Sequence, residues 1–496
     1  MDTARQEVAQ TFSVDEVGVV RSVEAGIASV TGLPGVASDE LVQFEGGELG
    51  VATDLTRDTV GVTLLTGSEG VRAGTLATRV GRVLDVPVGE ELLGRVVTPL
   101  GEPLDEGGPV RTSMRLPVER PATPIFERSP VSRPLHTGVK VVDALFPVGR
   151  GQRELIIGDR QTGKTSLAVA AILNQRDTGV KCIYCSIGSR GSQVARTVAT
   201  LAAQGALEYT TVVVAASHAP PGIRQVAPFA ATSMAEALME DGHDVLIVYD
   251  DLTQHARSYR ELSLLLRRPP GREAYPGDVF YLHARLLERA TQLSDRRGGG
   301  SLTALPIVEI QEGNLSAYIP TNLISITDGQ IVLSPALAAR GVLPAVNIGL
   351  SVSRVGGKAQ LPAFREVSGR LRLAHAQFEE LERFARFGAD LDEGTRQTLL
   401  RGERVREILQ QGATETIPAS EQIAVLLALN AGLFDGLAIE KIPQAQLELR
   451  QTVRREHAET CERIESGEAL TDAEREALLA AARQALRPYV TTPVAP

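Results

Sequence analysis

The sequence is short of several residue types, and each shortage excludes a class of protein. Its 496 residues contain no tryptophan, 4% aromatic residues and three cysteines. An odd, small number of cysteines argues against a disulfide framework. The scarcity of aromatic side chains means that the core must consist of Val, Leu, Ile and Ala. No run approaches the roughly 18 apolar residues of a membrane span, so we expect no direct membrane insertion.

Basic residues are also in the minority. Lys and Arg number 51 and Asp and Glu 61, which gives a net charge of −10. Because nucleic-acid backbones attract basic surfaces, we expect no nucleic-acid partner. Residues 1–10 are polar and lack the apolar segment of a signal peptide. With 43% hydrophobic and 23% charged residues, the composition is typical of a soluble intracellular protein of about three domains.

Two of the cysteines, Cys182 and Cys185, form a C-x-x-C pair, which is a pattern of redox and metal sites. They lie in the apolar run 180–187, which we interpret as a buried strand. Residues three apart on a strand project to opposite faces, so the two thiols cannot meet. We therefore reject both a redox and a zinc site.

The strongest motif is Gly158-Asp-Arg-Gln-Thr-Gly-Lys-Thr165, which fits the pattern G-x-x-x-x-G-K-[ST]. An apolar run precedes it and a helix-favouring stretch follows it, as this pattern requires when it binds phosphate. The glycines let backbone N–H groups surround a phosphate chain, and the helix N-terminus adds positive potential. The residues expected to bind nucleotide here are Gly158, Asp159, Arg160, Gln161, Thr162, Gly163, Lys164, Thr165 and Ser166.

An acid follows a second apolar run, at Asp250 after Val245–Tyr249. A strand that ends in an acid, downstream of a phosphate loop, is typical of a Walker B strand. We therefore predict Mg²⁺ bound by the Thr165 hydroxyl, with Asp250 ordering the metal shell. The alternative is an acid that caps the next helix.

The periodicity of the chain divides it into three parts. Short Val-rich runs broken by glycine predict a small β-barrel over residues 1–78. Its expected strands are Val17–Val23, Ile27–Val30, Leu41–Phe44, Val51–Leu55 and Val60–Leu65. Alternating strands and helices predict an α/β P-loop NTPase (RecA-like) domain with a mainly parallel sheet over residues 79–356. Apolar residues at steps of three and four predict a helical bundle over residues 357–496.

Several longer runs resemble the alpha subunit of F-type ATP synthases, and the resemblance covers nearly the whole chain. The matching runs are Gly151–Thr165, Tyr249–Leu252, Leu264–Phe280, Gly300–Pro306, Asn322–Gln330 and Leu350–Gly357. The resemblance implies a hexamer of three alpha and three beta subunits, with the gamma subunit as central stalk and a delta subunit. It implies binding of ATP with Mg²⁺ without turnover, and a peripheral position on the cytoplasmic face of a bacterial membrane. It also implies coupling of ATP synthesis or hydrolysis to proton or sodium transport.

One departure bears directly on catalysis. Hydrolysis requires a group that orients or deprotonates the attacking water. Catalytic relatives carry a glutamate in a Gly-Glu-Arg run, where this chain has Gly188-Ser-Arg190. Ser189 supplies no base, and alpha subunits usually carry glutamine there. We expect hydrolysis at this chain's own site to be very slow or absent, with Asp251 as the improbable substitute base.

By resemblance, the chain's chemical contribution is made to a neighbour. Arg354 in Ser351-Val-Ser-Arg354 is expected to act as an arginine finger at the catalytic site of the beta subunit, and Ser351 is a serine that the family ties to activity. A guanidinium suits this role because it is always charged and presents a planar fork to phosphate oxygens. On the residues alone, an ordinary ion-pair arginine is the simpler interpretation.

Two further departures concern the nucleotide base. Alpha subunits carry Arg-Pro where this chain has Leu343-Pro344, and their Gln-x-Gln reads Gln411-Gly-Ala413 here. Gln411 is therefore the one glutamine left to contact the base. Two other classes stay open: a self-sufficient hexameric ATPase, such as a secretion motor or helicase, and a structural subunit without nucleotide.

Overall fold

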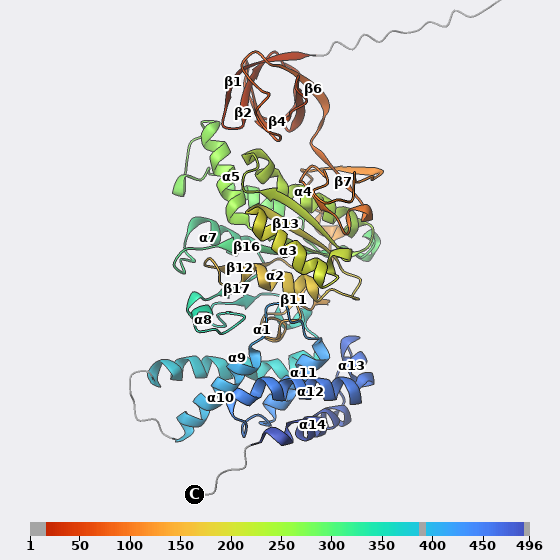
Figure 1. Ribbon diagram of the computed structural model, residues 1–496, viewed down its shortest axis with the longest axis vertical. Coiled ribbons are helices and arrows are strands. Elements are labelled where there is room, and N and C mark those ends of the chain that lie inside the picture. The colour runs from red at the N-terminus through yellow and green to blue at the C-terminus, as the bar shows by residue number, and fades with distance from the viewer. Residues whose placement is uncertain (1–15, 386–392, 491–496) are drawn as a thin grey trace, which may run out of the picture.

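The computed structural model describes residues 16–385 and 393–490. A β-barrel, an α/β domain and a helical domain follow one another along the long axis of the molecule (Figure 1). This arrangement confirms the predicted fold class. In the described ranges, no helix is both long enough and apolar enough to cross a membrane.

The barrel closes through six strands in the order β1-β2-β5-β4-β3-β6. Their bounds are β1 Val17–Glu24, β2 Ile27–Thr31, β3 Glu40–Phe44, β4 Leu49–Leu55, β5 Val60–Leu64 and β6 Leu76–Val83. The sequence predicts the first five and not β6, because Arg79 and Arg82 interrupt its apolar alternation. Arg79 instead forms a two-pronged ion pair with Glu40 on β3, at 2.9 and 3.1 Å. The expected domain boundary at residue 78 falls inside β6.

The central sheet has eight strands in the order β18-β17-β12-β16-β15-β13-β14-β8. All pairs are parallel except β17 with β18. The strands are β8 Val96–Val97, β12 Glu154–Gly158, β13 Lys181–Ser189, β14 Thr210–Ala216, β15 Asp244–Asp250, β16 Ser301–Glu309, β17 Gly329–Leu333 and β18 Val352–Ser353. Two small sheets pair β7 (Asp85–Val88) with β9 (Met114–Pro117) and β10 (Pro134–Leu135) with β11 (Val148–Gly149).

Helices cover both faces of this sheet. The helices of this domain are α2 Lys164–Leu173, α3 Gly191–Ala203, α4 Pro221–Glu240, α5 Leu252–Leu265, α6 Val279–Leu287, α7 Tyr318–Ile326 and α8 Pro335–Ala339. Cys182 belongs to the apolar cluster under α2, whereas Cys185 belongs to the cluster under α4. The two thiols are free and lie on opposite faces, as predicted from their spacing on a strand.

The helical domain contains α9 Pro362–Ala385, α10 Glu393–Leu409, α11 Ala419–Asn430, α12 Ile442–Glu456, α13 Ala458–Glu465 and α14 Asp472–Leu486. Helix α14 begins with a capping box in which the Thr471 hydroxyl accepts from the Glu474 backbone N–H and the Glu474 carboxylate accepts from the Thr471 N–H. The short helix α1, Lys140–Leu145, is buried throughout and joins this domain to the sheet. Lys140 Nζ donates to Gln446 Oε1 on α12 at 2.8 Å, and Asp143 accepts from Gln422 on α11 at 2.8 Å.

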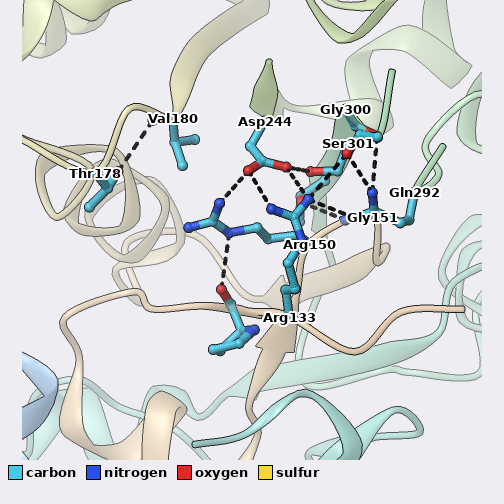
Figure 2. A network of polar contacts seen from close by, with 12 residues as sticks. Arg133, Arg150, Gly151, Thr178, Val180, Asp244, Gln292, Gly300 and Ser301 are labelled. Carbon is cyan, nitrogen blue, oxygen red and sulfur yellow. Dashed lines mark hydrogen bonds and ion pairs between the residues drawn. The ribbon is translucent and has the colours of Figure 1, made fainter. Parts of the chain in front are cut away.

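A polar network holds the amino ends of the strands together (Figure 2). The Asp244 carboxylate, at the start of β15, accepts from Arg133 at 2.7 and 2.9 Å, from Ser301 at 2.6 Å and from Arg150. The network ties the segment before the nucleotide-binding loop to two neighbouring strands. It lies at the sheet edge opposite the phosphate loop, so its two arginines have a structural role.

Candidate nucleotide site

The predicted phosphate loop lies between the carboxyl end of β12 and the start of α2. Gln161 and Gly163 have φ of +62° and +98°, and this left-handed backbone is what folds the loop back toward the helix. A Cβ placed on Gly163 meets no atom within 4 Å, so the loop encloses open space there. Arg160 is exposed and pairs with Glu309 at 2.8 Å, while Thr162 donates to the Asp159 carbonyl at 2.8 Å.

Lys164 is held over the loop by the loop's own backbone. The residue is 8% exposed, and Nζ donates to the carbonyl oxygens of Gly158 at 2.9 Å and Asp159 at 2.6 Å. Burial lowers the pKa of its ammonium group. A buried cation with neutral carbonyl partners is positioned to exchange them for phosphate oxygens.

The structure brings the two predicted metal residues together. Thr165 Oγ1 donates to Asp250 Oδ2 at 2.7 Å. Asp250 is buried at the end of β15, and this burial raises the pKa of its carboxyl group. A hydroxyl beside a carboxylate, next to a phosphate loop, is a donor set that suits Mg²⁺ with phosphate and water as its other ligands. The residues present therefore fit the predicted metal.

Tyr184 is a site residue that the sequence analysis missed. It lies on β13, and its hydroxyl donates to the same Asp250 Oδ2 at 2.7 Å. The available signal was a tyrosine within an otherwise apolar strand, because a buried tyrosine hydroxyl usually has a hydrogen-bond partner. The identity of that partner depends on the pairing of β13 with β15, which the sequence of neither strand predicts.

Asp251 follows Asp250 and has a different role. Its side chain caps α5 by accepting from the Gln254 N–H at 2.8 Å. Burial raises the pKa of its carboxyl group to about 7. The capping bond fixes this carboxylate at the start of a helix, which disfavours its use as a mobile base.

Ser189, which stands where catalytic relatives are expected to carry a glutamate, lies at the end of β13. Ser189 is the last residue of that strand and its carbonyl accepts from the Ser217 N–H at 3.0 Å. Gly188 has φ of +69°, and a Cβ there would lie 3.0 Å from Gln254 Cβ. The Gly188-Ser-Arg190 segment therefore offers hydroxyl and cationic side chains and no carboxylate.

Gln411 is placed in the joint between the α/β and helical domains. Its Oε1 accepts from the Lys140 N–H at 3.0 Å, and its Nε2 donates to the carbonyls of Gly138 and Glu415, each at 2.6 Å. The amide is thus used within the chain. Its backbone N–H also donates to the Leu343 carbonyl at 2.8 Å, and both residues line a cavity of about 290 Å³. A contact between Gln411 and a nucleotide base stays a prediction.

Arg354 and Ser351 flank the two-residue strand β18. Arg354 is exposed, and its Nη2 donates to the Ile324 carbonyl at 3.1 Å; over the described ranges its guanidinium has no ion-pair partner. Ser351 is 2% exposed. Its hydroxyl donates to the Asn347 carbonyl at 2.6 Å and accepts from the Val332 N–H at 2.9 Å. Ser351 therefore anchors the segment that presents Arg354.

Strand register separates Arg354 from the phosphate loop of its own chain. Ser353 pairs with Gly329, and Gly329 pairs with Glu154 at the amino end of β12. The phosphate loop leaves β12 at Gly158, which pairs with Leu333 at the carboxyl end. Four residues along a strand span roughly 13 Å. Arg354 therefore lies at the amino ends of the strands, and the phosphate loop lies at their carboxyl ends.

A strand, a phosphate loop, a helix that begins with Lys and Thr, and an acid at the end of a neighbouring strand define a P-loop nucleotide-binding domain. Comparison with known families agrees with this class. Residues 138–353 match the nucleotide-binding domain of the ATP synthase alpha/beta family, residues 360–485 its C-terminal domain and residues 13–81 its beta-barrel domain.

Individual relatives identify the branch of the alpha/beta family to which the chain is similar. ATP synthase subunit alpha 2 of Albidiferax ferrireducens is 58% identical over 99% of this chain and 92% of its own length. Subunit alpha 2 of Syntrophotalea carbinolica is 57% identical over 99% and 94%. Subunit alpha 1 of Shewanella frigidimarina is 56% identical over 99% and 95%. The chain belongs to the ATP synthase alpha subunit family, and therefore to an ATPase complex that binds nucleotide and serves ATP synthesis and ion transport.

Proposed function

We propose that this chain binds ATP with Mg²⁺ without hydrolysing it and supplies Arg354 to the catalytic site of a neighbouring beta subunit. Two features of one sheet support this division. At the carboxyl ends of its strands, Lys164, Thr165 and Asp250 form a phosphate and metal site. Ser189, at the end of β13, supplies no general base there. At the amino ends of its strands, Arg354 is exposed and its guanidinium donates to the Ile324 carbonyl.

The observation that carries the proposal is the strand register of Arg354. Because its segment pairs with the amino end of β17, Arg354 lies at the opposite end of the sheet from the phosphates that its own chain would bind. A cation that serves phosphate chemistry from this edge must do so on another chain. Arginine fingers supplied in this way raise turnover by roughly 10³–10⁵.

When bound, Mg²⁺ would supply positive charge that offsets the negative charge of the phosphates. The Thr165 hydroxyl would hold it directly, and Asp250 would order its water shell. Lys164 would turn from the carbonyls of Gly158 and Asp159 to the phosphates. The glycine turn at Gly163 would surround the phosphate chain with N–H groups.

The assembly expected around the chain follows from its family. We propose an alternating hexamer of three alpha and three beta subunits around a gamma stalk, with a delta subunit. We place it as a peripheral complex on the cytoplasmic face of a bacterial membrane, coupled to proton or sodium transport. Purification of the complex, followed by identification of its companion chains, tests this composition; a ring of this chain alone would contradict it.

The decisive experiment measures binding and turnover separately on the purified chain. We expect the chain to retain ATP in the presence of Mg²⁺ and to show no ATP hydrolysis above a Lys164→Ala control. Turnover by the chain alone would favour the self-sufficient ATPase. In that case Asp251→Asn would identify the base, because Asp251 is the acid with a pKa near 7 beside the site.

A further inference from the structure

We propose that Tyr184 is a positioning residue that orients the Asp250 carboxylate for the metal in this chain's own nucleotide site. The inference rests on the proposed function, because it adds a residue that supports the proposed metal site through a hydrogen bond to Asp250. It concerns a hydroxyl that does not itself touch nucleotide or metal.

Two side chains donate to a single oxygen of Asp250. Thr165 Oγ1 and Tyr184 Oη each lie 2.7 Å from Oδ2. Over the described residues, hydrogen bonds to this carboxylate are found at Oδ2, which leaves Oδ1 for the metal or a water in its shell. Hydrogen bonds of this kind orient a carboxylate that serves a metal.

The donor from Thr165 is not sufficient by itself. The Thr165 hydroxyl oxygen is expected to bind the metal. The same hydroxyl group therefore serves both the metal and the hydrogen bond to Asp250. Tyr184 approaches from β13, where it pairs with Val248 on β15, two residues before Asp250. Tyr184 is 1% exposed and belongs to the packed cluster of the α2 face, so its ring is fixed by the core. Its hydroxyl therefore holds Asp250 in place with or without the metal.

The chain contains a matched control for this residue. Tyr249 is the residue directly before Asp250, is fully buried and also uses its hydroxyl, in a 2.8 Å hydrogen bond with Thr232. It lies in the cluster on the opposite, α4 face of the sheet. Tyr249→Phe therefore removes one buried tyrosine hydroxyl next to the same aspartate without removing a donor to its carboxylate.

The experiment compares ATP affinity of the purified chain with Mg²⁺ and with EDTA, for the parent, Tyr184→Phe and Tyr249→Phe. We expect Tyr184→Phe to weaken affinity by about 10- to 100-fold with Mg²⁺, the usual loss when the partner of a metal ligand is removed. Its affinity in EDTA should equal that of the parent. Tyr249→Phe should leave both affinities unchanged, and thermal melts of the two variants should be similar.

An Asp250→Asn background completes the test. If Tyr184 acts through Asp250, adding Tyr184→Phe to Asp250→Asn should change the Mg²⁺-dependent affinity by less than a factor of about two. Equal losses in Mg²⁺ and EDTA, equal losses in the two Phe variants, or additive losses with Asp250→Asn would each overturn the inference. A parent chain that binds no ATP would instead overturn the proposed function.

Discussion

Lys164 and Arg354 are the two cations assigned to phosphate, and they lie at opposite edges of the same sheet. Lys164 is buried, and two carbonyls of its own loop hold its ammonium group at 2.6 and 2.9 Å. Arg354 is exposed and bonds one carbonyl at 3.1 Å. The cation proposed to serve its own chain is enclosed by that chain's backbone. The cation proposed to serve another chain is exposed.

The supporting residues follow the same division. Around Lys164 the neighbours, Thr165 and Asp250, have side chains suited to the ligand itself. Around Arg354 the neighbour Ser351 has no free hydroxyl, because both its hydrogen bonds are to backbone groups. The first region is built to bind, whereas the second is built to hold one exposed side chain in place.

The sharpest way to break this comparison is Arg354→Ala. We expect turnover of the assembled complex to fall by about 10³–10⁵, since an arginine finger acts on the charge of the transition state. Nucleotide binding by this chain should not change. Parallel assays of complex turnover and of ATP retention measure the two effects, and equal turnover in variant and parent would reject the assignment.

The reciprocal change is Lys164→Ala. Loss of a charged hydrogen-bond donor is expected to weaken ATP binding by roughly 10- to 100-fold. Because we propose that this site holds nucleotide without turning it over, the rate of the complex should fall much less than with Arg354→Ala. Equilibrium dialysis and steady-state assays measure the pair, and a loss of turnover as large as that of Arg354→Ala would contradict the division.

A smaller effect is expected from Ser351→Ala. The Val332 N–H then lies buried without its acceptor, which costs about 1–3 kcal/mol of unfolding free energy. The freed segment should also present Arg354 less firmly, so turnover should fall by a smaller factor than with Arg354→Ala. Urea unfolding and turnover are the two measurements. Unchanged stability would show that the two bonds are not maintained in solution, and Ser351→Thr should retain part of both.

Two buried histidines set the pH range of these measurements. His255 and His283 are buried with ring centroids 5.4 Å apart, and burial lowers the pKa of His255 to about 4 and that of His283 well below its ordinary value. The unfolded chain therefore binds more protons below pH 6.5. The contribution of the two neutral histidines to the free energy of unfolding is therefore complete above about pH 6.5. It is lost as the pH falls toward 4, at about 1.4 kcal/mol per pH unit for each histidine. Urea midpoints measure it, and an unchanged pH slope in His255→Gln would contradict it.

The sequence was most informative where one segment contains the whole pattern. The phosphate loop, Thr165 and the Asp250 strand end were all predicted, because neighbouring residues in the chain define each of them. The β-barrel strand β6 was missed because Arg79 and Arg82 interrupt its apolar pattern. Arg79 is compensated by Glu40 on β3, whereas Arg82 pairs with Asp85. A distant partner on another strand determined that outcome.

The remaining features depend on pairing between segments far apart in the chain. The bond from Tyr184 to Asp250 requires that β13 lie beside β15. The position of Arg354 depends on the register of a two-residue antiparallel strand. The amide of Gln411 is occupied by the segment before α1, some 270 residues earlier. None of these follows from local periodicity or from motif spacing.

Helix α1 has a mechanical consequence for the subunit. Lys140 and Asp143 connect it to three helices of the bundle, and just before it the carbonyl of His136 accepts from Asn174 and Gln175 at the end of α2. Swinging the bundle away from the sheet would have to break either the contacts of α1 with the bundle or those of the preceding segment with the end of α2. Amide hydrogen exchange in α1 should accordingly be as slow as in β12; faster exchange would show a loose joint. A load applied to the bundle is thus delivered, through a stiff coupling, to the helix whose other end holds the phosphate loop.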